Sequence, residues 1–228
     1  MKISVIIPTL NESGNIGRLI KMLDGAQQNA EIIVVDGGSI DATPAIAQQA
    51  GATVIATQPG RGGQIARGAS QAQGDVLLFL HADSQWPPDG LRAIRTALTA
   101  HEHAIGGNFR LLFDGQDAFS LWLNRFYGWI RARGFYYGDS GLFLLRAEYD
   151  RIGGMRPMAL MEDFDLVRRM EKTGRTVCIQ DPPLITSSRR FRGRSPFAIV
   201  VGWCVIHALY LVGISPDRLA RLYRSTQT

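Results

Sequence analysis

Two aspartates follow apolar runs of the kind that forms buried strands. Asp36 comes directly after Glu31–Val35, and Asp83 comes shortly after Asp75–Leu80. A carboxylate at position 36 can accept hydrogen bonds from a polar ring edge or a ribose. One at position 83 is suited to a divalent cation, because hard cations prefer oxygen ligands. The two residues therefore indicate a site for a ligand of nucleoside type together with a metal ion.

A third acidic site is a cluster rather than a single residue. Glu162 and Asp163, with Asp165 close by, open a helical pattern that begins at Phe164. Neighbouring carboxylates raise the pKa of at least one member, and a carboxylate with a raised pKa is a usable general base. The alternative is that Asp163 only caps the helix, which is a common role of aspartate. Three acidic sites on one expected rim favour the functional interpretation.

Other candidate residues give weaker signals on their own. Gly60–Gly63 precedes a helical pattern and offers backbone N–H groups to an anion, without the ending of a P-loop. Arg67 on that helix is a candidate phosphate ligand, or else forms a surface salt bridge. His81 is a candidate metal ligand, although a single histidine at a strand end is more often packed or hydrogen-bonded.

Aromatic and basic groups mark the second half of the chain. The spacing of Trp122, Phe126, Tyr127 and Trp129 predicts side chains that belong mostly to the core, with a substrate groove as the alternative. The stretch Arg189–Arg192 suits a diphosphate, or else is a solvated basic loop.

The first 80 residues alternate between strand and helix patterns. Expected strands are Ile3–Ile7, Glu31–Val35, Thr53–Ala56 and Asp75–Leu80, and expected helices are Asn15–Leu23, Thr43–Ala50 and Ile65–Gln73. This order predicts an α/β fold with a mostly parallel central sheet flanked by helices. Ligands bind at the carboxyl ends of the strands in such sheets. Pro8–Glu12, Asp36 and His81–Asp83 should therefore share one rim.

Later elements follow a less regular order and end in an apolar segment. Strands are expected at Gly106–Phe113, Leu142–Leu145 and Thr176–Ile179, and helices at Leu91–Ala100, Phe119–Ile130, Glu148–Ile152 and Phe164–Thr173. Phe197–Ile214 then runs for 18 residues without a formal charge. Eighteen residues is the lower limit for a membrane span, and a helix on the core or in the lipid interface is at least as compatible with this segment.

Composition excludes several classes of protein. The chain has 228 residues, 46% of them hydrophobic, and only two cysteines, which argues against disorder, collagen and a disulfide scaffold. Cys178 and Cys204 are expected to be reduced, buried thiols of a cytoplasmic protein. The net charge of +5 comes mainly from residues 184–228, beside the apolar run. That placement points to an anionic membrane surface or substrate and away from nucleic acid.

Five short motifs occur in an order that resembles the family 2 inverting glycosyltransferases, which have the GT-A fold. They are Val5–Glu12, Ile33–Ser39, Gly60–Arg67, Leu78–Asp83 and Met161–Asp163. The resemblance covers about residues 1–190 and is nearest to small bacterial members with a His-Ala-Asp metal motif. It implies a GT-A domain over 1–190, with a nucleotide-binding half (1–100) and an acceptor half (101–190). Residues 191–228 would form a basic and apolar helical extension.

The resemblance also implies a role for individual residues. Its nucleotide-binding positions are Pro8, Glu12, Asp36, Arg67, Ala82 and Asp83. Asp83 would bind Mn²⁺ or Mg²⁺, and Asp163 would be the general base. Further candidates for contact with the diphosphate or the acceptor are Arg189, Arg190, Glu162 and Asp139. The family's metal motif often reads Asp-x-Asp, so His81 replaces a carboxylate that usually contacts the ribose.

The activity implied is transfer of a single sugar from a nucleotide sugar, with UDP as the leading donor, to an acceptor hydroxyl with inversion. The acceptor stays open between a lipid carrier, another small molecule and a saccharide. A peripheral contact of Phe197–Ile214 with the inner face of the cytoplasmic membrane is a further expectation. Two alternatives remain, a sugar-phosphate nucleotidylyltransferase and a membrane-peripheral binding protein whose active site has decayed.

Overall fold

A computed structural model describes residues 1–24, 30–191, 193 and 195–225. Its sheet consists of β1 (Ile3–Thr9), β2 (Ala30–Asp36), β3 (Thr53–Ala56), β4 (Val76–Phe79), β5 (Ala104–Phe113), β6 (Leu142–Leu145) and β7 (Arg175–Thr186). The helices are α1 (Ile16–Asp24), α2 (Thr43–Gln49), α3 (Arg61–Gln71), α4 (Gly90–Ala100), α5 (Ala118–Arg131), α6 (Arg146–Arg151), α7 (Glu162–Thr173), α8 (Pro196–Leu211) and α9 (Pro216–Ser225), with short 3₁₀ turns η1 (Gly138–Ser140) and η2 (Arg189–Phe191). The predicted α/β class is confirmed.

One sheet in the order β3-β2-β1-β4-β6-β5-β7 organises the chain. β1 pairs in parallel with β2 and β4, β2 with β3, and β5 with β7. β6 is antiparallel to both of its neighbours, β4 and β5. Because β6 runs the other way, its amino end lies at the same edge as the carboxyl ends of the six other strands. Residues that precede β6 therefore meet residues that follow β1, β2, β4 and β7.

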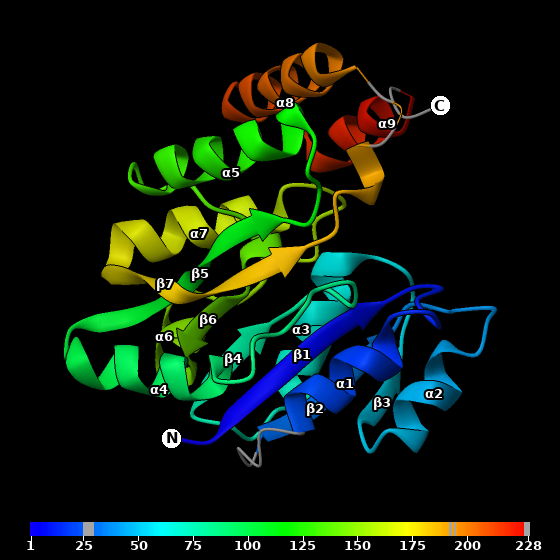
Figure 1. Cartoon of the computed structure of the whole chain (residues 1–228), viewed down its shortest axis with the longest axis vertical. Coiled ribbons are helices and arrows are strands. Elements are labelled where there is room, and N and C mark those ends of the chain that lie inside the picture. Colours follow the sequence, from blue (N-terminus) through cyan, green and yellow to red (C-terminus); the bar gives the residue numbers. More distant parts are fainter. Residues whose placement is uncertain (25–29, 192, 194, 226–228) are drawn as a thin grey trace.

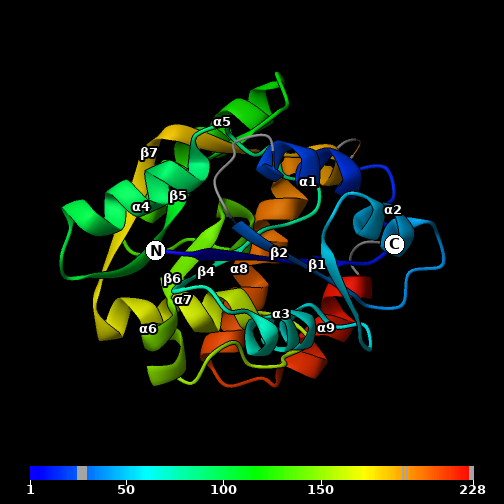
Figure 2. The same ribbon diagram turned by 90° about the horizontal axis from the view of Figure 1, so that it is seen from below.

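Helices cover both faces of the sheet, with α1 and α4 on one face and α3, α6 and α7 on the other (Figure 2). Side chains that alternate along β1 explain this arrangement, since Val5 and Ile7 pack with α1 and α4, whereas Ile6 packs with α3. The close packing of α3 depends on Gly68, where a Cβ would lie 2.6 Å from Cγ2 of Ile6. The result is a three-layer structure with one apolar core on each side of the sheet.

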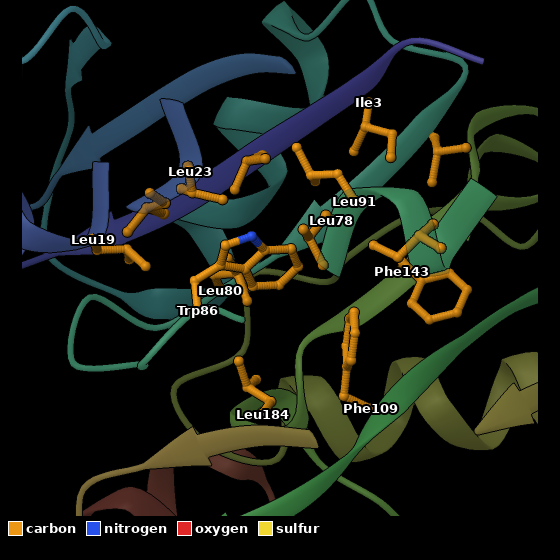
Figure 3. Packing of buried hydrophobic residues seen from close by; sticks show 14 of the residues in the cluster. Ile3, Leu19, Leu23, Leu78, Leu80, Trp86, Leu91, Phe109, Phe143 and Leu184 are labelled. Carbon is orange, nitrogen blue, oxygen red and sulfur yellow. The ribbon is translucent and has the colours of Figure 1, made fainter. Parts of the chain in front are cut away.

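The core on the α1 side also anchors the loop that follows β4. Trp86 is 1% exposed and lies among Leu80, Phe109 and side chains of α1 (Figure 3), with 5.3 Å between the ring centroids of Trp86 and Phe109. The N–H of Gln85 in the same loop donates to the carbonyl of Ile185 in β7, at 2.8 Å. Packing and this hydrogen bond together fix the loop that carries Asp83.

Most predicted elements are confirmed to within a few residues, and three differ in ways that affect the site. α3 begins at Arg61, four residues earlier than expected, so most of the Gly60–Gly63 stretch is helical. β7 continues to Thr186, well beyond the predicted end at Ile179. α7 begins at Glu162 with Met161 as its N-cap, so Asp163 lies in the first turn and is not the cap.

The last two helices pack over one end of the molecule together with α5, in the upper part of Figure 1. Ile199 of α8 contacts a cluster with Phe113 and Leu123, while Ile206 of α8 and Leu219 of α9 pack near Phe164 of α7. Among the described residues, no helix combines the length and the apolar character needed to cross a bilayer. The interpretation of Phe197–Ile214 as a helix on the core is confirmed for the side of α8 that carries Ile199 and Ile206.

Two expectations about burial were wrong. Cys204 is exposed and Cys178 is only half-buried, because α8 leaves part of its surface uncovered and β7 is an edge strand. In α5, Trp122 is 41% exposed and Trp129 is 55% exposed, so the aromatic group is not mainly a core. The rings of Trp122, Phe126 and Trp129 stack on one another along the helix instead.

Candidate active site

A polar crevice of about 750 Å³ lies at the edge where the parallel strands end. Its walls come from the ends of β1 and β4, the start of α3, the loop before α7 and one residue of α9. The predicted residues that line it are Pro8, Glu12, His81, Ala82 and Asp83, and the others are Thr9, Leu10, Thr57, Gln58, Pro59, Gly60, Arg61, Gly63, Gln64, Pro157, Met158, Ala159 and Asp217. Four of the six predicted nucleotide-binding residues are thereby brought together.

Asp36 lies just behind this wall, opposite Thr9 in the register of β1 and β2. It is 4% exposed, and its carboxylate accepts hydrogen bonds from the hydroxyls of Thr9 and Ser39 and from the backbone N–H groups of Gly38 and Ser39. These bonds fix the loop after β2. The structure therefore places Asp36 next to the crevice and not among its lining residues.

Arg67 also lies outside the lining of the crevice, whereas Arg61, at the start of the same helix, is part of it. Sequence analysis considered only the backbone N–H groups of Gly60–Gly63 and assigned no role to the Arg61 side chain, because it placed the start of α3 four residues too late. Gln64, one turn after Arg61, is also in the wall, and its side-chain amide donates to the carbonyls of Thr9 and Val35 at 2.9 and 2.7 Å. The first turn of α3 is thus the part of this helix that faces the site.

Arg189 connects two of the predicted site residues that line the crevice. Its guanidinium lies 2.9 Å from a carboxylate oxygen of Glu12 and 3.3 Å from one of Asp83. The extension of β7 to Thr186 explains this position, because it delivers η2 to the same edge as β1 and β4. The side chain of Arg190, another predicted residue, lies outside the part of the chain that the structure describes.

A second cavity, of about 400 Å³, adjoins the crevice and has a different character. Seven aromatic residues line it, together with aliphatic side chains from α5, α8 and the loop before α7. Its lining residues are Arg61, His81, Phe126, Tyr127, Trp129, Ile130, Arg133, Phe135, Tyr137, Asp139, Leu160, Met161, Asp163, Val200, Trp203, Cys204, Ile206, His207 and Tyr223. Three of the four predicted aromatic residues of α5 line this cavity, and Trp122 does not.

Arg61 and His81 line both cavities and so mark the place where they meet. Gly138 is beside this junction, because a Cβ there would lie 3.2 Å from Oδ2 of Asp163 and 3.3 Å from Nε2 of His81. A ligand in the crevice and a ligand in the aromatic cavity would thus approach each other next to Asp163. The sequence pointed to His81 and Asp163 separately but not to their meeting with Arg61 and Gly138, since these residues come from α3, the loop after β4, η1 and α7.

Asp163 is held firmly at the junction. Its Oδ2 accepts a hydrogen bond of 2.9 Å from the N–H of Gly138, and the guanidinium of Arg61 is 3.6 Å away. Burial raises the pKa of the Asp163 carboxyl, but the charge of Arg61 and the N–H groups of Gly138 and Phe164 outweigh it, so the pKa lies below its ordinary value. Asp163 is therefore ionised at neutral pH and can accept a proton from a bound hydroxyl.

Glu162 differs from its neighbour although both contact Arg61. It is 1% exposed and forms an ion pair with the guanidinium of Arg61. Burial raises the pKa of Glu162 further than the attraction to Arg61 lowers it. The prediction that the cluster contains one carboxyl with a raised pKa is confirmed, but that carboxyl is Glu162 and not the proposed base. Asp139, another predicted candidate, is 5% exposed and lines the aromatic cavity.

Two residues that sequence reasoning did not assign to the site form part of the cavity wall. The hydroxyl of Tyr137 is 2.9 Å from Nε2 of His207, and Nδ1 of His207 is 2.7 Å from the carbonyl oxygen of Trp203. This pair joins α8 to the backbone just before Gly138. The feature of the sequence that could have pointed to this pair was His207 itself, a polar residue within an otherwise apolar segment.

The crevice fits a divalent cation only when a substrate with phosphate groups is also bound. In the described part of the chain, no three histidine, cysteine or acidic side chains gather closely enough to hold a metal ion. Asp83 lines the crevice, and Glu12 and Asp217 are further carboxylates in its wall. Mg²⁺ is commonly bound by one or two carboxylates and substrate phosphates, and this residue set fits that mode of binding.

Two non-glycine residues with positive φ lie near the cavities. Among the described residues they are Asn11, with φ of 55°, and Met161, with φ of 68°. Asn11 precedes Glu12 at the crevice, and Met161 lines the aromatic cavity directly before the Glu162–Asp163 pair. Such conformations are uncommon outside glycine and cluster at functional sites.

Comparison with solved structures shows the same fold. The chain aligns over 92% of its length with the Staphylococcus aureus protein TarS, at a TM-score of 0.66 and 18% identity, and covers 40% of that chain. It aligns over 93% with glucosyl-3-phosphoglycerate synthase from Mycobacterium tuberculosis, solved with Mn²⁺, UDP and phosphoglyceric acid, at a TM-score of 0.65 and 20% identity, and covers 79% of that chain.

Sequence comparison adds curated relatives. Dolichol-phosphate mannosyltransferase from Pyrococcus furiosus is 37% identical over 118 residues, which are 48% of this chain and 34% of the relative. Glucosyl-3-phosphoglycerate synthase from Mycolicibacterium paratuberculosis is 34% identical over 94 residues, which are 36% of this chain and 28% of the relative. The chain thus spans about a third of the length of these relatives. The pattern of glycosyl transferase family 2 matches residues 4–160, and the chain belongs to this family.

Proposed function

We propose that this chain transfers a single sugar from a nucleoside diphosphate sugar, with UDP as the nucleotide, to an acceptor hydroxyl with inversion. The observation that carries the proposal is the meeting of two cavities at Arg61 and His81, one polar and one aromatic, with Asp163 at their junction. A reaction between two substrates needs two such sites and a base between them. Membership of glycosyl transferase family 2 supports the assignment of sugar transfer.

The polar crevice is the proposed donor site. Pro8, Glu12, Ala82 and Asp83 line it directly, and Asp36 holds the loop after β2 in place from behind. Arg189 is not among the lining residues, but its guanidinium contacts Glu12 and Asp83, which are, so it is close enough to pair with the diphosphate. Arg67, outside the lining, would act only at a distance.

In the proposed reaction Asp163 accepts the proton of the acceptor hydroxyl. The acceptor oxygen forms a bond to the anomeric carbon on the face opposite the nucleotide, and the bond from that carbon to the diphosphate oxygen breaks. The electron pair of the broken bond stays on the diphosphate, which leaves with its negative charge paired to Arg189. One displacement of this kind inverts the configuration at the anomeric carbon.

Asp83 is the proposed protein ligand of Mn²⁺ or Mg²⁺, which bind with the donor diphosphate. Such an ion stabilises negative charge on the leaving group as a Lewis acid. The solved glucosyl-3-phosphoglycerate synthase complexes that contain UDP with Mn²⁺ or Mg²⁺ support this choice of nucleotide and ion. His81, next to Asp83 in the crevice wall, takes the place of the carboxylate expected near the ribose.

The proposed halves of the domain correspond to the two cavities. Residues 1–100 build most of the donor crevice, and residues 101–190 build much of the aromatic cavity. The segment 191–228 completes that cavity with α8 and α9. We place the boundaries at residues 100 and 190 for this reason.

We also propose a peripheral contact of α8 with the inner face of the cytoplasmic membrane. Phe197, Leu211 and Val212 are more than 70% exposed, and Val201 and Val205 are more than 40% exposed. Arg218 and Arg221 follow on α9 and are exposed as well. Apolar side chains beside basic residues are typical of helices that lie in the interface of an anionic bilayer.

The proposal is tested with a panel of nucleotide sugars and Mn²⁺. We expect release of UDP from one UDP-sugar, loss of this activity on addition of EDTA, and a product of opposite anomeric configuration by NMR. Release of pyrophosphate from a nucleoside triphosphate and a sugar phosphate would instead identify a nucleotidylyltransferase. Failure of every nucleotide sugar to bind or to turn over would indicate a decayed active site.

A further inference from the structure

The aromatic cavity has one buried, charged end and one exposed end. Asp139 and Asp163 at the buried end are 5% and 9% exposed, next to Arg61. Trp129 at the other end is 55% exposed, and the guanidinium of Arg133 lies 3.8 Å from the centre of its ring. A ligand that enters past Trp129 would therefore reach Asp163 with its innermost atoms.

Between these ends, the walls present carbon atoms. Phe126, Tyr127, Phe135, Val200 and Trp203 contribute rings and an aliphatic side chain from three separate segments. The volume of about 400 Å³ falls within the range of ~300–1,000 Å³ that holds drug-sized ligands. Burial of apolar surface would supply most of the binding energy for a ligand placed here.

Polar groups of the wall are largely occupied with one another. Nδ1 of His207 lies 2.7 Å from the Trp203 carbonyl oxygen, and its Nε2 lies 2.9 Å from the Tyr137 hydroxyl. Both ring nitrogens are therefore engaged within the wall. Burial also raises the pKa of the Tyr137 hydroxyl, so that it stays protonated.

The charges at the buried end disfavour an anionic acceptor. Asp163 and Asp139 line this end, Glu162 lies directly behind, and Arg61 is the cation that contacts Glu162 and Asp163. A phosphate group brought to Asp163 would meet like charge in a buried site, where such repulsion is strong. A neutral hydroxyl meets no such repulsion and can donate its proton to Asp163.

We infer that the acceptor is an uncharged apolar alcohol, whose hydrocarbon body lies among the aromatic rings and whose hydroxyl reaches Asp163. This inference rests on the proposed sugar transfer and adds the chemical class of the acceptor. It separates this chain from relatives named for transfer to undecaprenyl phosphate, since their named acceptor carries a phosphate.

The test uses a matched pair of acceptors, farnesol and farnesyl phosphate, which share one hydrocarbon chain and differ in the phosphate. We expect farnesol to quench the fluorescence of Trp129 and Trp203 and to accelerate UDP release from the UDP-sugar and Mn²⁺. We expect farnesyl phosphate to bind at least about tenfold more weakly, a difference of ~1.4 kcal/mol. Equal or tighter binding of farnesyl phosphate would overturn the inference.

Two variants of α8 locate the binding site. Val200 lines the cavity, whereas Val201 does not and is 42% exposed. We expect Val200→Trp to fill the cavity and weaken farnesol binding at least about tenfold, or ~1.4 kcal/mol, while Val201→Trp leaves it unchanged. Both variants should keep wild-type affinity for UDP and Mn²⁺, which shows that they are folded.

The outcomes distinguish this inference from the proposed function. A wild-type protein that turns over a UDP-sugar only with farnesyl phosphate or a saccharide would keep the proposed function and refute the apolar acceptor. Unchanged farnesol binding in Val200→Trp would refute the site. A protein that binds no nucleotide sugar, and hydrolyses none, would refute the proposed function itself.

Discussion

The donor crevice and the aromatic cavity are built on different principles. The crevice lies where parallel strands end, and the hydrogen bonds between strands fix the positions of its residues, as the pairing of Thr9 with Asp36 illustrates. The aromatic cavity lies between α5, α7, α8 and α9 and depends on how helices pack. Strand order and register therefore fix the positions of the crevice residues, whereas packing between helices fixes those of the aromatic cavity.

The extent of the family match separates the two cavities only in part. It ends at residue 160, so it includes β1 and β4, which Glu12 and Asp83 follow, but neither Asp163 nor α8. The residues of α5 and of the loops up to Leu160 that line the aromatic cavity lie within the match, together with most of the crevice. The region beyond the match supplies the proposed base and the wall that α8 and α9 contribute to the aromatic cavity. The two cavities therefore differ most in the part of the wall that lies outside the family pattern.

The largest effect is expected for Asp163→Asn, which should slow sugar transfer without weakening nucleotide binding. The amide keeps the size of the side chain but cannot accept the proton, and a positioned base typically contributes ~10²–10⁴-fold. Turnover should fall by about that factor, while binding of UDP and Mn²⁺, measured by calorimetry, stays unchanged. Wild-type turnover in this variant would show that the base lies elsewhere.

The pH dependence of activity offers a second test of whether Asp163 is the base, because the pKa values of Asp163 and its neighbour Glu162 shift in opposite directions. The pKa of Asp163 lies below its ordinary value and that of Glu162 above its own. If Asp163 is the base, activity decreases only as pH falls through a pKa below that of an ordinary aspartate. An acid limb at a pKa above that of an ordinary glutamate, lost in Glu162→Gln, would point to Glu162 instead.

A smaller effect is expected on the donor side from Arg189→Ala. Hydrogen bonds to charged groups contribute ~1.5–3 kcal/mol, so loss of one contact with the diphosphate should weaken UDP binding about tenfold or more. Arg92→Ala is the matched control, because Arg92 pairs with Asp89 on the surface, outside both cavities. Equal UDP affinities of Arg189→Ala and the wild type would remove Arg189 from the donor site.

Most of the fold could be predicted from the sequence, since the strands of the first half are short apolar runs separated by amphipathic helices. The direction of β6 could not, because a run such as Leu142–Leu145 has the same pattern in either orientation. The position of α8 could not be predicted either. This helix is apolar on all sides, so its pattern does not indicate which face is buried.

The site was predictable where it follows directly from strand ends, as for Glu12 and Asp83. It was not predictable where it depends on contacts between distant segments. Arg61 and Glu162 are 101 residues apart, and their ion pair requires the first turn of α3 to lie against the loop before α7. A Cβ on Gly62 would come within 2.6 Å of the carbonyl oxygen of Arg156, which shows how close this approach is.

The smallest effect is expected from two glycine substitutions, which compare how tightly α3 and α5 are packed. Gly68 of α3 lies against the sheet, where a Cβ would come within 2.6 Å of Ile6 and 2.8 Å of Val35, whereas Gly128 of α5 has no atom within 4 Å of such a Cβ. Gly68→Ala should lower the free energy of unfolding by ~1–3 kcal/mol through overpacking. Gly128→Ala should raise it by up to ~1 kcal/mol, because alanine favours helix over glycine.

Urea unfolding of both variants measures the two changes on one scale. UDP affinity of the folded Gly128→Ala protein should match that of the wild type, since Gly128 lies outside both cavities. A destabilised Gly128→Ala would mean that α5 is packed as closely as α3. The contrast between a site fixed by strand register and a site formed by loosely covered helices would then be wrong.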